Sequence, residues 1–199
     1  MVAVVGRPAL AVSAGGRDKR RLRGLPATVA AEAAAAGGRV EVVGSIGDDD
    51  AGDTVAVLLG RAGVGHAALL RDPAGRTPMG DAGDGPAPRL DARDVELGLR
   101  YIVDASVIVL AEALPVDVQR VILDAASYQG AAIVALVEPG GALELELAQV
   151  STVLEAPPGD VPPFSAMVGH YAARLDAGST EEEAFREAVR DSGWEAGGG

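Results

Sequence analysis

A run of three aspartates is the first feature of this sequence that could do chemistry. The run, 48–50, follows an apolar stretch and Gly47, and it precedes a helical pattern. Carboxylates at such a position accept hydrogen bonds from the free amides of the first helical turn, and their charge is favourable against the helix dipole. Clustered carboxylates also suit hard cations such as Mg²⁺. We expect helix capping to be their role and predict no dedicated metal site.

One basic segment interrupts this acidic chain, within the polar connection 13–24. Arginines there could hold a phosphate, but a run of like charges is more often a solvated surface, so we predict a loop. The segment contains Arg17, Lys19, Arg20, Arg21 and Arg23.

Two further features resemble catalytic elements only superficially. The run 80–85, rich in Gly and Asp, leads directly into prolines at 86 and 88, so we expect a turn rather than an anion-binding loop. His66 and His170 have no carboxylate or nucleophile close to them in the sequence. We therefore predict structural or surface roles for both histidines.

The composition limits the classes of function. The chain has 199 residues, with 17 Lys and Arg against 29 Asp and Glu, which gives a formal net charge of −12. Because nucleic acids and anionic membranes would be repelled by such a surface, we predict neither as a partner. The chain has no cysteine, which excludes disulfides, thiolate catalysis and zinc–thiolate sites.

Length and hydropathy fit one folded domain. Hydrophobic residues make up 48% of the chain and aromatic residues only 3%, so Ala, Val, Leu and Ile must build the core. We predict a single domain over 1–195 and a flexible tail over 196–199. No apolar run approaches the roughly 18 residues of a membrane helix. The first residues also lack the basic start of a signal peptide, so we expect a cytoplasmic protein.

Short β-rich runs alternate with Ala-rich helical runs along most of the chain. This alternation predicts an α/β fold in which helices cover a mostly parallel sheet. The expected strands are 2–5, 40–43, 67–70, 107–110, 133–137 and 153–154.

Proline and glycine mark the ends of the expected helices. For the last helix, Ser179 with Glu182 three residues later predicts a capping box. The other expected helices are 27–36, between Pro26 and Gly37, and 116–128, between Pro115 and Gly130.

The region 25–77 carries a series of motifs that identify a family. After an Ala-rich helix come Gly37-Gly38-Arg39-Val40, Val42-Val43-Gly44-Ser45-Ile46-Gly47-Asp48-Asp49, Ala62-Gly63-Val64 and Arg76-Thr77. This series resembles the N-terminal half of the ribokinase-like (PfkB) carbohydrate kinases, and 107–115, 131–137 and 164–188 resemble later parts of that family. The resemblance implies a three-layer, Rossmann-like sheet flanked by helices, with the family's lid reduced to 13–24.

The resemblance also implies site positions, several of which depart from the family pattern. The family's Gly-Ala-Gly-Asp motif supplies a catalytic base and an anion hole, but here its register holds two prolines, Phe164 and Ser165. Asp160, from the family's magnesium and phosphate element, is the candidate substitute base. A long stretch that carries much of the family's ATP site is missing after Asp160. The substrate-binding positions implied are Ala11, Gly24, Thr28, Gly47 and Asp48.

These departures predict a shortened, degenerate family member, a pseudokinase that binds a small ligand or a protein partner. No cofactor is expected, and the nucleotide-binding residues are not assignable. The alternative is an ATP-dependent sugar or nucleoside kinase that uses Mg²⁺ and ATP, with Asp160 or the run 48–50 replacing the lost base. A third hypothesis is a structural protein that forms a homodimer through an exposed sheet edge or helix face.

Overall fold

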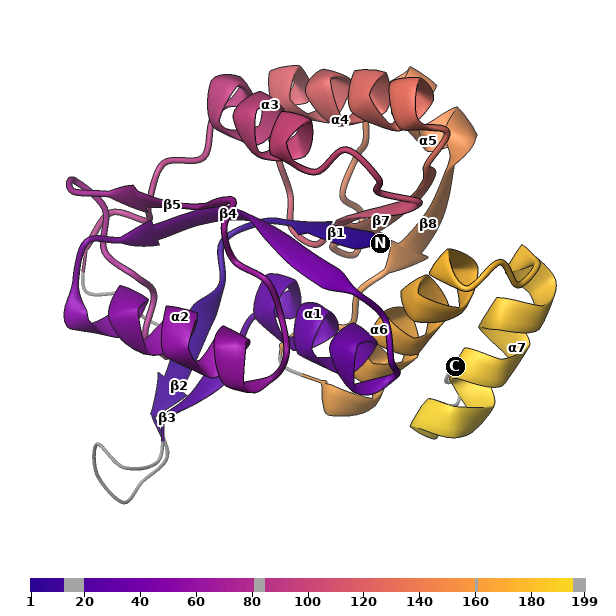
Figure 1. The fold of residues 1–199 in the computed structure, drawn as a ribbon, viewed down its shortest axis with the longest axis horizontal. Coiled ribbons are helices and arrows are strands. Elements are labelled where there is room, and N and C mark those ends of the chain that lie inside the picture. The colour runs from indigo at the N-terminus through magenta and orange to yellow at the C-terminus, as the bar shows by residue number, and fades with distance from the viewer. Residues whose placement is uncertain (13–19, 81–84, 160, 195–199) are drawn as a thin grey trace.

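Short runs rich in Val, Ile and Leu form a six-stranded sheet at the centre of the molecule (Figure 1). The computed structural model describes residues 1–12, 20–80, 85–159 and 161–194. Every neighbouring pair of strands in the central sheet is parallel, and the strand order is β5-β4-β1-β6-β7-β8. The strands are β1 (Val2–Val5), β4 (Val40–Gly47), β5 (Leu69–Asp72), β6 (Val107–Leu110), β7 (Ala132–Val137) and β8 (Ser151–Glu155).

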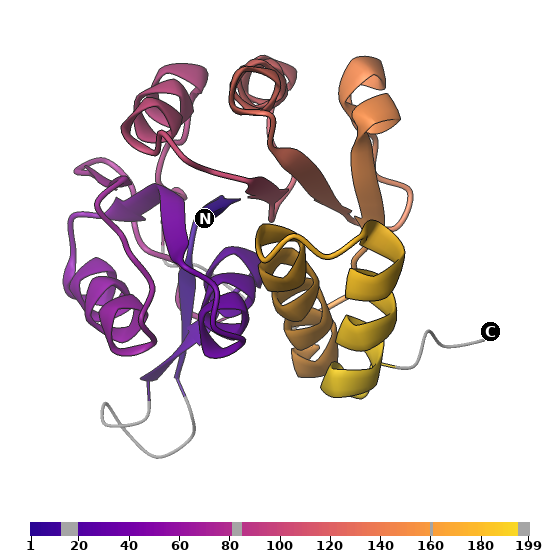
Figure 2. The ribbon, with the colours of Figure 1, turned by 45° about the vertical axis from the view of Figure 1, so that its right-hand side comes forward.

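Helices cover both faces of this sheet, which confirms the three-layer α/β architecture expected from the sequence (Figures 1 and 2). None of the helices in the described part of the chain is long and apolar enough to cross a membrane. One face carries α3 (Ala92–Tyr101), α4 (Val116–Gln129) and α5 (Leu145–Val150), and the other carries α1 (Leu25–Ala35), α2 (Asp50–Arg61), α6 (Pro162–Asp176) and α7 (Glu181–Ser192).

The two helical layers bury separate halves of the core. Val2 and Val4 face the layer of α1 and α6, whereas Ala3 and Val5 face the layer of α3 and α4, as the alternation of a strand requires. Helices α1 and α6 pack closely because Gly169 has no side chain. A Cβ at Gly169 would lie 2.6 Å from the Cβ of Glu32 and 2.7 Å from the amide of Ala33.

The strand order contains one switch point. The chain moves from β1 to β4 and β5 on one side, then returns to β6 and continues through β7 and β8 on the other side. The crossovers next to β1 and β6 therefore leave in opposite directions, and the switch point lies at the carboxyl ends of these two strands. In open α/β sheets, ligands bind at the carboxyl edge near such a point.

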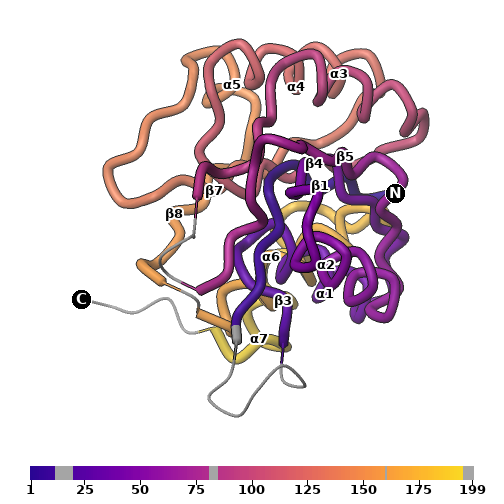
Figure 3. The backbone as a smooth tube through the Cα atoms, turned by 90° about the vertical axis from the view of Figure 1, so that its left-hand side faces the viewer, coloured from indigo at the N-terminus to yellow at the C-terminus, as the bar shows by residue number. Residues whose placement is uncertain are grey.

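A second, two-stranded sheet corrects one prediction. The basic residues Arg20, Arg21 and Arg23 lie in a strand, β3 (Arg20–Arg23), which pairs antiparallel with β2 (Ala9–Val12), rather than in a solvated loop. Leu22 explains the difference, because it lies opposite the buried Leu10 and packs against the core. The hairpin extends away from the main sheet (Figure 3). Arg17 and Lys19 lie outside the described residues.

Most predicted elements are confirmed, with shifts at their ends. Strand β4 extends to Gly47 rather than ending at Val43, and the predicted strand 67–70 begins two residues later. Gly130 ends α4 in the left-handed conformation, as expected. The predicted capping box at Ser179 is wrong by one residue, because Thr180 is the N-cap and accepts a hydrogen bond from the amide of Glu183.

Candidate functional site

An ion pair occupies the switch point of the sheet. Arg7 follows β1 and Glu112 follows β6, so both side chains start at the carboxyl ends of the two central strands. The Arg7 backbone amide and Nε donate hydrogen bonds to Glu112 Oε1, over 3.2 and 2.8 Å. The side chains remain 30% and 21% exposed, so both groups are partly accessible to solvent.

Burial changes the acidity of Glu112. Its surroundings remove much of the water that would stabilise the carboxylate, and this desolvation raises the pKa of Glu112 above the ordinary glutamate value. The charge and hydrogen bonds of Arg7 act in the opposite direction without cancelling the effect. Glu112 is therefore a partly desolvated carboxyl group whose hydrogen-bond partner is Arg7.

Gly6 brings the start of α1 up to this ion pair. Its φ is +151°, and a Cβ at Gly6 would lie 2.5 Å from Cγ of Pro26 and 3.2 Å from Cγ of Glu112. No side chain fits between these two neighbours. The first turn of α1 therefore lies directly beside the switch point.

Thr28 on α1 and Ser165 on α6, two positions singled out from the sequence, lie next to each other. The Thr28 hydroxyl donates a hydrogen bond to Ser165 Oγ over 3.0 Å, and it also lies 3.0 Å from the carbonyl of Gly24. Ser165 is 1% exposed. Gly24, a third predicted site residue, is the N-cap of α1 with φ of +76°, a conformation that favours glycine.

The N-terminus of α6 has no free amide hydrogen over its first four residues, all of which the structure describes. Pro162 and Pro163 lack an amide hydrogen, and the amides of Phe164 and Ser165 both donate to the carbonyl of Val161, over 3.0 and 3.2 Å. The ring of Trp194 packs edge-on against Phe164 at a centroid distance of 5.3 Å. The donors that an anion hole requires are therefore not available at this helix end.

A second set of interactions fixes the loop between β4 and α2. Asp49 caps α2, accepting hydrogen bonds from the amides of Gly52 (2.8 Å) and Thr77 (3.0 Å). The hydroxyl of Thr77 in turn accepts one from the amide of Gly47 over 2.9 Å. Partial burial opposes ionisation of Asp49, but these amides, the Thr77 hydroxyl and Arg76 together lower its pKa. The capping role predicted for the run 48–50 is confirmed at Asp49.

A groove of about 640 Å³ lies beside this loop, at the carboxyl edge of the sheet. Arg20 donates to the Thr54 hydroxyl over 2.8 Å, which holds its guanidinium at the rim. Both signs of charge line the groove, so it suits a small polar molecule with several hydroxyl or charged groups. The lining residues are Arg20, Asp49, Asp50, Ala51, Arg76, Thr77 and Met79.

The remaining predicted site residues are placed less favourably. Ala11 is almost completely buried in β2, opposite Arg21, and offers only a methyl group. Asp48 is 62% exposed and lies 3.6 Å from Arg71, so its carboxylate faces solvent beside the groove rather than lining it. Gly47 contributes its backbone amide only. Asp160 lies outside the described residues.

Neither histidine lies with the site residues. His66 contacts the carbonyl of Val64 through Nδ1 at 3.3 Å, and His170 lies within α6. Within the described ranges, no three His, Asp or Glu side chains come together closely enough to hold a metal ion.

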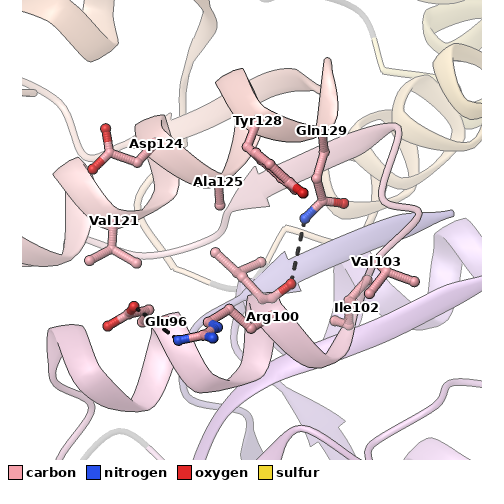
Figure 4. Close-up of a pocket in the computed structure, with 10 residues that line it drawn as sticks. Glu96, Arg100, Ile102, Val103, Val121, Asp124, Ala125, Tyr128 and Gln129 are labelled. Carbon is pink, nitrogen blue, oxygen red and sulfur yellow. Dashed lines mark hydrogen bonds and ion pairs between the residues drawn. The ribbon is translucent and has the colours of Figure 1, made fainter.

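A cavity of about 580 Å³ between α3 and α4 is separate from this site (Figure 4). Its walls include Leu99, Ile102 and Val121. The side-chain amide nitrogen of Gln129 lies 3.5 Å from the Leu99 carbonyl oxygen. The cavity lies toward the C-terminal ends of both helices, which are at the amino edge of the sheet. Ligands of open α/β sheets bind at the carboxyl edge, so the groove beside α2 is the better candidate for the ligand site, although the cavity is more apolar.

Sequence reasoning did not find Arg7, Glu112 or Thr77 as site residues. Arg7 and Glu112 each follow a strand of four buried residues after one intervening residue, a repeated pattern that was visible in the sequence. Recognising it required the strand order, because only neighbouring parallel strands bring their carboxyl ends together. Thr77 belongs to the Arg76-Thr77 motif of the family resemblance, which assigns it no role.

Comparison with known proteins supports the fold and not a closer assignment. No family model matches the sequence, and no curated protein matches it either. Solved structures match over nearly the whole chain. A candidate sugar kinase from Clostridium perfringens has a TM-score of 0.71 at 11% identity, over 96% of this chain and 87% of its own.

Two further solved structures are similar to this chain over nearly its whole length. Arabidopsis thaliana ribokinase, complexed with ribose and ATP, has a TM-score of 0.66 at 15% identity, over 96% of this chain and 90% of its own. Phosphofructokinase-2 from Escherichia coli, in complex with potassium, has a TM-score of 0.63 at 15% identity, over 96% of this chain and 91% of its own. At these identities the similarity shows a shared fold, and the chain has a ribokinase-like α/β fold.

Proposed function

We propose that this protein is a ribokinase-like domain that binds a small polyhydroxylated molecule at the carboxyl edge of its sheet and does not transfer phosphate to it. The observation that carries the proposal is the start of α6. Two prolines remove amide hydrogens, the next two amides bond to Val161, and Ser165 is buried against Thr28. Phosphoryl transfer depends on positioned donors and a base, and the described residues at this helix end supply neither.

Two features support ligand binding at the same edge. The groove beside α2 contains both carboxylate and guanidinium groups, which suit a sugar or nucleoside rich in hydroxyls. The Arg7–Glu112 pair at the neighbouring switch point adds a carboxylate and a cation that are partly exposed. The fold family of the solved relatives, which includes a ribokinase with bound ribose, supports the same class of ligand.

The alternative is an ATP-dependent sugar or nucleoside kinase with a substituted base. The similarity to structures that contain ATP favours it. Among the suggested substitutes, however, Asp49 is committed to capping α2, and Asp48 is exposed beside Arg71. This alternative therefore depends on Asp160 or Asp50, and Mg²⁺ and ATP would be its cofactors.

The test of binding is calorimetric titration with ribose, fructose and adenosine, one at a time. We expect saturable binding of at least one probe, with micromolar to low millimolar Kd. Arg76→Ala should weaken that binding at least fivefold, because it removes a cation from the groove. Arg120→Ala, on the opposite helical layer, is the control and should leave the Kd unchanged. If none of the probes binds, the proposed ligand class is wrong.

A further inference from the structure

The last strand of the sheet leaves one edge open. Strand β8 ends the strand order, and no other strand in the described part of the chain pairs with its outer side (Figure 2). The amide of Ala156 donates to the carbonyl of Val137 in β7, over 2.8 Å. Because backbone groups alternate in direction along a strand, Val153 and Glu155 direct their amides and carbonyls toward the open side.

Exposed apolar side chains border this edge on both faces of the sheet. On the face of α5, the side chains of Leu145, Val150 and Val153 are 70%, 60% and 43% exposed. On the opposite face, Phe185 of α7 is 39% exposed and packs edge-on against Tyr171, whose hydroxyl lies 3.3 Å from Oγ1 of Thr152 in β8. Open strand edges of this kind template pairing with another strand.

We propose that β8 pairs antiparallel with β8 of a second copy of this chain, with the two-fold axis at Val153. The proposal does not depend on the ligand-binding function. In this register Val153 lies opposite its own counterpart, Glu155 opposite Ser151, and Thr152 opposite Leu154. The outward backbone groups of Val153 then bond to each other, and the two central sheets become one continuous sheet.

The side chains of β8 suit this symmetric register. Glu155 faces a serine rather than a second carboxylate, so no like charges are directly opposed within the strand pair. Val153 meets Val153 of the second copy, and the neighbouring Val150 and Leu145 extend the apolar contact. The formal charge of −12 on each copy opposes association over longer range, so the dimer should strengthen as salt screens that repulsion.

The experiment combines sedimentation equilibrium with a designed cross-link. Wild-type protein is expected to show a monomer–dimer equilibrium with a Kd in the micromolar range, which tightens with added salt. The chain has no cysteine, so Val153→Cys introduces a single thiol. Directly opposed strand residues have Cα atoms about 5.5 Å apart, within disulfide range, so mild oxidation should give a covalent dimer.

Matched variants separate this contact from others. Val57→Cys places a thiol at a side chain 53% exposed on α2, far from β8, and should cross-link at least tenfold more slowly. Val153→Lys opposes two cations at the axis and should abolish the dimer while thermal unfolding shows a folded monomer. A wild-type monomer up to near-millimolar concentration, or equal cross-linking of the two cysteine variants, would overturn the proposal.

Discussion

The hydroxyl of Thr28 donates to Oγ of Ser165 over 3.0 Å, joining α1 to α6 across 137 positions of the chain. The two residues are the ones that the family resemblance places in the substrate-binding motif and at the catalytic base. The structure brings them together as a neutral hydrogen-bonded pair in which Ser165 is buried and Thr28 is partly buried. The ribokinase-like fold is thus combined, at these two positions, with a hydrogen-bonded contact between α1 and α6.

Substitutions at Ser165 should show that the site accepts a neutral group and rejects a carboxylate. Ser165→Ala loses one neutral hydrogen bond and should cost about 1 kcal/mol, or about 2–4 °C in Tm for a chain of this size. Ser165→Asp places a charge where the native residue is 1% exposed and should cost several times more. Thermal unfolding at neutral pH measures both. Equal stability of the two variants would show that the site is hydrated or holds a cation.

Asp49 and its neighbour Asp48 should differ sharply in their contribution to stability. Asp49→Ala removes a helix cap and the bond to the Thr77 amide and should cost about 2 kcal/mol. Asp48→Ala, at an exposed carboxylate, should cost less than about 0.5 kcal/mol. Urea unfolding gives both values.

The contribution of Asp49 should also depend on pH. Its folded-state pKa is lowered from 3.8, so its stabilisation is present above that value and is lost as the pH falls through the lower pKa of the folded state. The stability gap between wild type and Asp49→Ala should therefore narrow below about pH 4. A gap that widened in acid would contradict this assignment.

Glu112 should show the opposite pH dependence. Its folded-state pKa is raised from 4.5 by burial, so the folded protein holds the proton more tightly than the unfolded chain. Relative to Glu112→Gln, wild type should therefore gain free energy of unfolding as the pH falls from neutral to below 4.5. Urea unfolding at a series of pH values measures the difference, with Glu146→Gln on α5 as the surface control. A constant difference across this range would show that the carboxylate is not desolvated.

Gly44 should tolerate no side chain. A Cβ there would overlap the carbonyl oxygen of Gly6, which directly follows the neighbouring strand β1, and a backbone carbonyl cannot rotate away. Gly44→Ala should cost more than about 3 kcal/mol. Gly60→Ala, in the last turn of α2 with its nearest neighbour 3.4 Å away, should be neutral or stabilising by up to about 1 kcal/mol. Similar Tm values for the two variants would contradict the close strand approach.

The sequence predicted the sheet and most helices because these depend on local patterns. The runs around Val2 and Val107 are uniformly apolar, as strands covered on both faces must be. Strand β3 was not predicted, because its arginines resemble a surface loop, and only the pairing of Leu22 with Leu10 shows otherwise. The run 48–50 was correctly expected to cap a helix, since capping depends on neighbours in sequence.

The site itself depended on contacts that no local pattern contains. Glu112 lies 105 positions from Arg7, and the pair forms only because β1 and β6 are adjacent in the sheet. The family resemblance indicated Thr28 and Ser165 without any structure, and their role as site residues stays a prediction. The resemblance could not show that the two side chains bond to each other, nor that the amides of Phe164 and Ser165 are already occupied.

The most direct test of the central claim is a phosphoryl-transfer assay with purified protein, Mg²⁺ and γ-labelled ATP, offering ribose, fructose and adenosine as acceptors. We predict no labelled acceptor above the amount formed without protein. A product that forms in proportion to protein concentration and disappears with Asp160→Ala would contradict the proposal and establish a kinase with a substituted base.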